Sequence, residues 1–188
     1  QAGGEGASFE TIVASGPNSA SPPYRSGHRT LTAGDPVILD FGCIVDGYLS
    51  DQTRTVVVGG DPPPSFTEVH ETVLEASRAA VDAIEPGVQA NEVDAAARTV
   101  IEDAGYGDCF PHVTGHGVGL DIHEPPFLIG GSYLEGWNHV ELAPGMVFSI
   151  EPAIYTDEFG VRVEDLVVVT ESGAERLNDS PKGWEPLG

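Results

Sequence analysis

The chain has 188 residues, of which 40% are hydrophobic, and this is enough for one domain with a sizeable core. Thirty acidic and eight basic residues give a net charge of −22, which argues against nucleic-acid binding and against anionic membrane surfaces. No apolar run is long enough to span a membrane, and the first residues do not resemble a signal peptide, so we expect a cytoplasmic protein.

Strand signals come first along the chain. A Gly-rich lead to about residue 7 is followed by a predicted strand at 9–15 and a turn at 16–18. Residues 37–58 are rich in strand-forming residues on both sides of Asp46-Gly47, a dipeptide typical of tight turns. This segment is therefore predicted to be a β-hairpin.

Two helices are predicted next. Ser65 and Glu68 form a capping-box pattern that begins a helix running to about residue 84, and a second helix covers about 91–104. Apolar residues at helical spacing predict the inward faces: Val69, Val73, Ala76, Ala80 and Ile84, then Val93, Ala97, Val100 and Ile101. Helices placed between two pairs of strands predict an α+β domain with a curved antiparallel sheet.

Residues 133–139, which include Trp137, are predicted to form a surface loop with one packed aromatic residue, and a loop beside a functional site is the alternative. His70 and His139 are expected to be structural or surface residues.

The second half of the chain repeats a pattern of the first half at a distance of 111 residues. Gly34 is followed six residues later by Asp40, and Gly145 is followed six residues later by Glu151. In each half the chain continues through a Gly-containing turn into three consecutive valines, again 111 residues apart. The repeat therefore places an acid in the same strand context twice.

Each half also contains a second acid, Asp51 in the first and Glu164 in the second. Subtracting 111 from 164 gives 53, and an offset of two residues keeps both side chains on one face of a sheet. Four carboxylates, including Asp40 and Glu151, are thus expected to converge. Burying four like charges requires protonation, cationic partners or metal, and because cations are scarce in this chain we favour metal.

Residues 110–126 contain three of the six histidines of the chain, His112, His116 and His123. Neutral imidazole is a common metal ligand, so this density suggests a site, although a loop with incidental histidines is the alternative. The glycines around His116 would let the backbone approach whatever that side chain touches, and they are Gly115, Gly117 and Gly119. One imidazole with several carboxylate oxygens suits Mn, Fe, Co or Zn and leaves the identity of the metal open.

Taken together, these motifs resemble the pita-bread metallopeptidases of the M24 type, a family that includes methionine aminopeptidases, aminopeptidase P and Xaa-Pro dipeptidases (prolidases). The resemblance extends from Ile12 to Gly173. It implies a pita-bread fold with a pseudo-twofold repeat. It also implies a dinuclear site for two divalent metal ions, manganese above all, with the ligands Asp40, Asp51, His116, Glu151 and Glu164.

The same resemblance implies roles for the neighbouring residues. Glu151 would act as the general base. His112 and His123 would contact the substrate and assist proton transfer, while Arg162 and Tyr155 would support the metal ligands.

Two stretches, 50–55 and 160–165, look like the proline-peptidase branch, which implies hydrolysis of short peptides with proline at the second position. Relatives in that branch usually have a histidine 17 residues before the first ligand, where this chain has Pro23, and His28 lies too far along to replace it. Hydrolysis of a non-peptide amide, such as an ectoine-like molecule, therefore stays open. So does a non-enzymatic peptide-binding module.

The resemblance and the length imply that residues 1–188 are a metallopeptidase catalytic domain without the family's N-terminal domain. The repeat predicts that the helices of the first half are also missing. Counterparts of the helices beginning near residues 65 and 91 would fall before residue 1, since 65 and 91 are both smaller than 111. The sheet of the first half should then expose an apolar face. This would favour a homodimer or cover by a missing N-terminal segment.

The charge generates the first prediction. With a single lysine, Lys182, the strong acidity is typical of proteins from salt-loving organisms, where counterions screen self-repulsion. The melting temperature should therefore rise between low and molar KCl, as the Debye length shortens to about 3 Å at 1 M. A flat or falling series of thermal melts would favour the alternative, an ordinary acidic protein from a genome rich in G and C.

Overall fold

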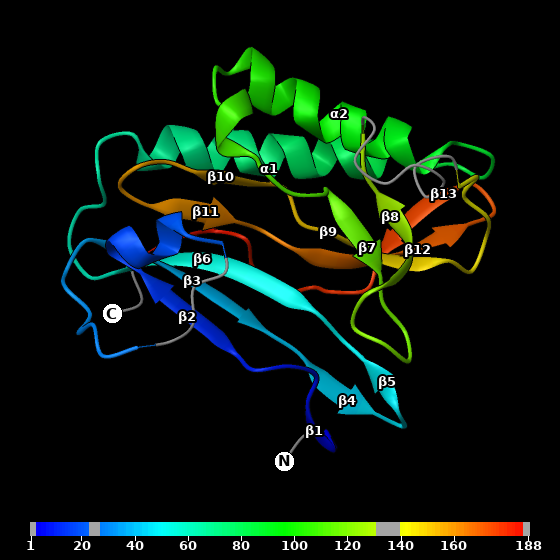
Figure 1. Cartoon of the computed structure of the whole chain (residues 1–188), viewed down its shortest axis with the longest axis horizontal. Helices are drawn as coiled ribbons and strands as arrows, with labels where there is room; N and C mark the ends of the chain where they lie inside the picture. Colours follow the sequence, from blue (N-terminus) through cyan, green and yellow to red (C-terminus); the bar gives the residue numbers. More distant parts are fainter. Residues whose placement is uncertain (1–2, 23–26, 131–139, 186–188) are drawn as a thin grey trace.

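The computed structural model describes residues 3–22, 27–130 and 140–185 (Figure 1). Two helices, α1 (Phe66–Asp82) and α2 (Ala90–Asp103), lie together over one face of the strands (Figure 1). None of the helices in the described ranges is both long enough and apolar enough to cross a membrane.

The strands form antiparallel sheets in both halves of the chain. The first half contains β1 (Gly6–Ala7), β2 (Ile12–Ser15), β3 (Asp35–Phe41), β4 (Cys43–Val45), β5 (Tyr48–Leu49) and β6 (Gln52–Val58), with the 3-10 helix η1 (Gly16–Ala20) after β2. These strands pair in the orders β2-β3-β6 and β1-β4-β5. The long hairpin of β3 and β6 confirms the one predicted for 37–58.

The second half contains the 3-10 helix η2 (Gly107–Cys109) and the strands β7 (Gly115–Gly117), β8 (Glu124–Leu128), β9 (Val147–Ile150), β10 (Ala153–Tyr155), β11 (Gly160–Arg162), β12 (Asp165–Thr170) and β13 (Gly173–Arg176). Five of these strands form one sheet in the order β13-β12-β9-β7-β8, and β10 pairs with β11. The expected α+β class with antiparallel sheets is what the structure shows.

The repeat of 111 residues is a physical feature of the fold. Thr53 and Glu164, which are 111 residues apart, form an antiparallel bridge, and the Thr53 hydroxyl donates to Glu164 Oε2 over 2.6 Å. Arg54 and Asp165, also 111 residues apart, form an ion pair of 2.6 Å. In a twofold arrangement, a residue and its equivalent in the other half can touch only where both lie close to the axis. The pseudo-twofold axis therefore passes between these pairs.

The two turns that begin the repeat have the same backbone. Gly34 and Gly145 both have φ of +90°, a conformation that side chains disfavour, and each turn leads into a strand, β3 or β9. At Gly34 a Cβ atom would also lie 2.5 Å from the carbonyl oxygen of Asp61. Glycine is thus required twice for the same reason.

The helices confirm the predicted inward faces but not the predicted capping box. Every predicted inward residue is buried except Val100, which is partly buried. The predicted capping box at Ser65 is wrong, because Ser65 already has helical φ and ψ angles and its side chain makes no cap hydrogen bond. A capping-box bond forms instead at α2, where the N–H of the cap residue Gln89 donates to the side chain of Glu92, at Oε1, over 3.2 Å.

His70 is a structural residue of α1, as expected. It is 1% exposed and its ring packs against Phe66 with centroids 5.8 Å apart. Burial lowers the pKa of His70 to about 4, so it is neutral at physiological pH. His139 and the predicted loop at 133–139 lie outside the described residues.

The sheet of the first half has one buried face and one partly exposed face. Ala14 and Ile38 point into the core, whereas Val13 and Phe41 are 40% and 41% exposed. Among the described residues before β3, the only helical element is η1. Within the described part of the chain this second face is therefore accessible at Val13 and Phe41, whereas Val37 on the same face is buried.

The second prediction concerns the ion pair beside the axis. Arg54 and Asp165 are both buried, so Arg54→Met should lower the free energy of unfolding by about 3 kcal/mol, the usual cost of removing one partner from a buried pair. Arg78→Met is the control, because the Arg78–Glu75 pair is 60% exposed on both sides and should matter by less than about 0.5 kcal/mol. Chemical denaturation of both variants measures the difference, and equal losses would contradict the prediction.

Candidate metal centre

The five side chains predicted as metal ligands come from five different places in the fold. Asp40 lies on β3, Asp51 directly before β6, His116 on β7, Glu151 directly after β9, and Glu164 between β11 and β12. All five line one cavity of about 830 Å³. The fold therefore brings together every predicted ligand.

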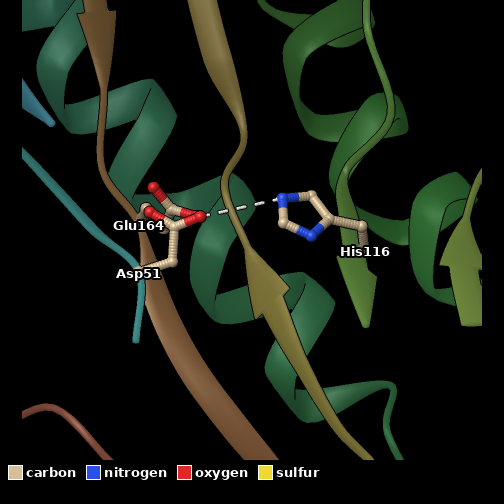
Figure 2. Close-up of side chains that lie close together, drawn as sticks. All are labelled: Asp51, His116 and Glu164. Carbon is tan, nitrogen blue, oxygen red and sulfur yellow. Dashed lines mark ion pairs between the residues drawn. The ribbon is translucent and has the colours of Figure 1, made fainter. Parts of the chain in front are cut away.

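Three of these side chains form a compact group. One oxygen each from Asp51 and Glu164 and one nitrogen of His116 lie within 4.8 Å of one another. Figure 2 shows the two carboxylates next to each other, with the imidazole facing them. The His116 Nε2 atom is 3.9 Å from Asp51 Oδ2 and 3.1 Å from Glu151 Oε1.

The tautomer of His116 follows from its hydrogen bond. Its Nδ1 atom lies 3.1 Å from the carbonyl oxygen of Gly117, and because a carbonyl only accepts, Nδ1 must hold the hydrogen. In the neutral ring that a metal ligand requires, the lone pair is therefore on Nε2, the nitrogen that faces the carboxylates. In the metal-free cluster this nitrogen instead carries a proton, which it donates to Glu151 Oε1. A backbone carbonyl on the far nitrogen is the usual arrangement for a histidine that binds metal.

Three buried carboxylate oxygens in the cavity have no hydrogen-bond partner among the described residues. They are Asp40 Oδ1, Asp51 Oδ1 and Glu164 Oε1. A buried unpaired carboxylate oxygen is costly unless a cation neutralises it. Hard oxygens with one imidazole nitrogen form a donor set that suits divalent ions such as Mn, and the residues present thus fit a metal centre.

The acids perturb one another. Burial and then the charges of Asp40 and Glu151 raise the pKa of Asp51 to about 7. The pKa of Glu164 is also raised by burial and by the neighbouring acids. Burial raises the pKa of Asp40 as well, although the guanidinium of Arg162 opposes this. Without metal, the cluster therefore keeps protons at a pH where isolated carboxylates would have lost them.

Glu151 behaves differently from these three acids. Burial alone would raise its pKa, but the hydrogen bond and charge of His116 outweigh burial and lower it. The same contact raises the pKa of His116 against the effect of its burial. Ser149 adds a second bond, since its hydroxyl donates to Glu151 Oε1 over 3.1 Å. Glu151 is thus the acid most readily ionised in the metal-free cluster.

Arg162 connects the cluster to His112. Its guanidinium donates to Asp40 Oδ2 and to the Tyr155 hydroxyl, the latter over 2.6 Å. That hydroxyl lies 3.1 Å from His112 Nε2, and His112 Nδ1 lies 2.8 Å from the carbonyl oxygen of Val113. Because the carbonyl fixes the hydrogen on Nδ1, Tyr155 donates to Nε2. Both ring nitrogens of His112 are therefore occupied by protein groups.

His123 lines the same cavity, and its ring lies 4.3 Å from that of His116, centroid to centroid. Among the described residues no hydrogen bond occupies its ring nitrogens. Burial, followed by the nearby charge of His116, lowers the pKa of His123. Of the two outer histidines, His123 is the one placed to contact a molecule in the cavity.

The glycines of the histidine segment have a different purpose from the expected one. At Gly115 a Cβ atom would lie 1.8 Å from the carbonyl oxygen of Ser149, and at Gly117 it would lie 2.4 Å from that of Glu124. They are required because neighbouring strands approach β7 closely, not because of what the side chain of His116 touches.

Two polar residues of the site were not found from the sequence. Thr53 binds Glu164, and Ser149 binds both Glu151 and the N–H of His116. Each lies two residues from an acid of its own strand segment, and the period of two in a strand could have indicated them. The apolar lining of the cavity was also missed, namely Phe9, Ile12, Val113, Ile122 and Phe127.

Comparison with known proteins decides the family. Residues 1–171 match metallopeptidase family M24. The chain belongs to this family. This M24 chain is 44% identical over 181 residues to the Xaa-Pro dipeptidase of Pyrococcus furiosus, a match that covers 96% of the chain and 50% of that protein. It is 45% identical over 172 residues to the probable dipeptidase PepE of Mycobacterium tuberculosis, covering 90% and 44%.

A solved structure agrees with this assignment. The prolidase from Thermococcus sibiricus superposes on the M24 chain with a TM-score of 0.92 at 45% identity, covering 98% of this chain and 48% of that one. The pita-bread fold expected from the sequence is thereby confirmed. The chain spans about half the length of the curated relatives it matches.

The third prediction follows from the raised pKa of Asp51. The folded chain prefers Asp51 protonated, so its contribution to stability falls as pH rises from about 3.8 to about 7. Asp51→Asn should therefore raise the melting temperature of the metal-free chain at pH 8 and leave it unchanged near pH 4. We expect a rise of at least roughly 2–4 °C, which corresponds to about 1 kcal/mol in a chain of this size.

Thermal melts in the presence of a chelator provide the measurement. Asp157→Asn is the matched control, because Asp157 is an exposed acid in the turn between β10 and β11, has no positive φ and should show no such gain. An Asp51→Asn variant that melts at or below the wild-type temperature at pH 8 would show that ionised Asp51 does not destabilise the folded chain.

Proposed function

We propose that this chain is the catalytic part of a dinuclear metallopeptidase that hydrolyses short peptides with proline at the second position. The observation that carries the proposal is the convergence of five ligand side chains in one cavity, with three buried carboxylate oxygens left without a partner. The relatives named Xaa-Pro dipeptidase and prolidase support the substrate class.

The ligands of two divalent ions would be Asp40, Asp51, His116, Glu151 and Glu164. The oxygen-rich donor set favours manganese, with Co, Zn or Fe as alternatives. When bound, the ions supply Lewis acidity for the scissile carbonyl and stabilise negative charge that develops there.

Glu151 would take the proton of the attacking water. The Ser149 hydroxyl donates to the Oε1 atom of Glu151, which leaves Oε2 to accept a proton. The lowered pKa keeps the carboxylate ionised, as a general base must be. The same oxygen would then deliver the proton to the leaving nitrogen.

The other residues would bind and orient. His123 would donate a hydrogen bond to the oxygen of the scissile carbonyl, a contact that is strongest in a cavity poor in water. Arg162 holds Asp40 and Tyr155 in place, and Tyr155 in turn fixes the ring of His112. His112 would thus shape the substrate side of the cavity rather than exchange protons through its occupied nitrogens.

The cavity offers an apolar surface for a proline ring through the side chains of Phe9, Ile12, Val113, Ile122 and Phe127. Pro22 also lines it, whereas Pro23 lies outside the described residues. His28 is exposed and does not line the cavity, so it does not replace the histidine usual in this branch.

Metal analysis combined with a substrate panel tests the proposal. The panel contains Xaa-Pro dipeptides, tripeptides beginning with Xaa-Pro, matched Xaa-Ala peptides and an ectoine-like amide. We expect bound transition metal and faster cleavage of the proline peptides. Purification without metal would favour a peptide-binding module, and cleavage of the ectoine-like amide alone would favour the other hydrolase.

The fourth prediction concerns the general base. Glu151→Gln should keep the fold but lower kcat by at least roughly 100-fold, because an amide cannot accept the proton. Glu75→Gln is the control, since Glu75 is 60% exposed on α1 and far from the chemistry. Steady-state kinetics on an Xaa-Pro peptide, with circular dichroism to verify folding, give the answer. Near wild-type turnover by Glu151→Gln would remove Glu151 from the mechanism.

A further inference from the structure

Asp94 is a fully buried acid on α2, outside the metal cluster. Its carboxylate accepts five hydrogen bonds, two from Arg98 and three from residues on either side of the β7–β8 pair. The N–H and hydroxyl of Thr114 donate to Oδ1 over 3.2 and 2.7 Å. The N–H of Gly130 donates to Oδ2 over 2.9 Å. One side chain thus holds the residue before β7 and a residue just after β8.

The approach of Gly130 to this carboxylate is close. A Cβ atom at Gly130 would lie 2.8 Å from Asp94 Oδ2, so a side chain there would push the carboxylate away. The glycine therefore permits the contact, and the chain at this point is shaped around Asp94.

Arg98 extends the contact to the segment that leads into β7. Its guanidinium pairs with Asp94 over 3.0 Å and also donates to the carbonyl oxygens of Phe110 and His112, both over 2.9 Å. The guanidinium carbon lies 4.4 Å from the centroid of the Phe110 ring, which in turn packs edge-on against the ring of His112. Arg98 is consequently bonded to the backbone of His112 and packed against the ring that supports it.

Thr114 connects Asp94 to Glu151, the candidate base. Its carbonyl oxygen accepts the N–H of Glu151 over 2.8 Å, while its own N–H and hydroxyl are bound by Asp94. Thr114 also lies two residues before His116 in the chain. The backbone of His112 is therefore bonded to Arg98 directly, and those of His116 and Glu151 are tied to Asp94 through Thr114.

We propose that Asp94 and Arg98 are positioning residues, which fix the placement of His112, His116 and Glu151 relative to the carboxylates of the other half. The expected effect on kcat rests on the proposed function, whereas the placement of the three residues does not. Neither residue lines the metal-cluster cavity, so both act through the residues they hold. Helix α2 thus provides the fixed support for the histidine side of the site.

Two variants test the proposal. Arg98→Lys keeps a cation beside Asp94, but one ammonium group cannot also bond the carbonyls of Phe110 and His112. Asp94→Asn keeps the shape and the oxygen for Thr114, but places an amide NH₂ against the donors on the other side. Each should lower metal affinity or kcat by roughly 10- to 100-fold, as is usual for partners behind the ligands, with KM changed by less than about threefold.

Two spectroscopic readouts separate positioning from general stability. Nitrogen NMR of the histidine rings in the metal-free chain should show changed signals for His112 and His116. The visible absorption of the cobalt-loaded chain should show altered ligand geometry. Ile101→Ala is the matched control, because Ile101 is a buried core residue of the same helix. It should lower the melting temperature and leave the ring signals and the cobalt spectrum as in the wild type.

Wild-type ring signals in folded Arg98→Lys and Asp94→Asn would overturn the proposal, and so would the same spectral change in Ile101→Ala. If the wild-type chain cleaves no proline peptide, the proposed function fails by itself, since the ring signals of the metal-free chain still decide whether the pair positions the histidines.

Discussion

Mutual repulsion among four neighbouring carboxylates, three of them buried and Glu151 partly buried, is the constraint on which the rest of the structure depends. Asp40, Asp51, Glu151 and Glu164 share one cavity, and the protein offers them few opposite charges of its own. Arg162 reaches Asp40, and His116 reaches Glu151, while Glu164 accepts a side-chain hydrogen bond from Thr53 alone among the described residues. The remaining repulsion raises pKa values in the metal-free chain, and the divalent cations of the proposed centre would relieve it. The same repulsion that destabilises the metal-free chain would therefore favour the binding of divalent cations.

The pseudo-twofold repeat explains how so many acids reach one place. Each half contributes a strand that ends in an acid and a second strand with another acid, and the halves meet where Thr53 pairs with Glu164. The axis is braced by a pair of equivalent residues, Arg54 and Asp165. Arg176 and Lys182 also lie within ion-pair distance of Asp165. Several of the few cations in the chain thus stabilise the backbone beside the cluster rather than the cluster itself.

The sequence was informative where a period or a repeat has a physical meaning. Helical spacing located the buried faces of α1 and α2, and the repeat located Asp40 and Glu151, because equivalent strands in a twofold structure end at equivalent places.

Prediction from the sequence failed where the outcome depends on contacts between residues distant in the chain. Serine is a residue type favoured at helix caps, yet the backbone of Ser65 is already helical. The partner that occupies His112 is Tyr155, 43 residues away, and no local pattern indicates it. Asp94 could have been noticed, since an acid beside Val93 on the inward face of a helix requires a buried partner.

The separation of the ligands along the chain has a consequence for folding. Asp40 and Glu164 are far apart in sequence, His116 lies between them, and the contacts that join the halves are 111 residues apart. Loops of this length must close before any of these contacts can form, so the proposed ligand cluster has high contact order and is complete only when both halves have docked. Metal is then unable to nucleate the fold from a local segment. Its stabilising effect should appear mainly as slower unfolding of the finished structure, which makes this a site that preserves the fold kinetically rather than one that guides its formation.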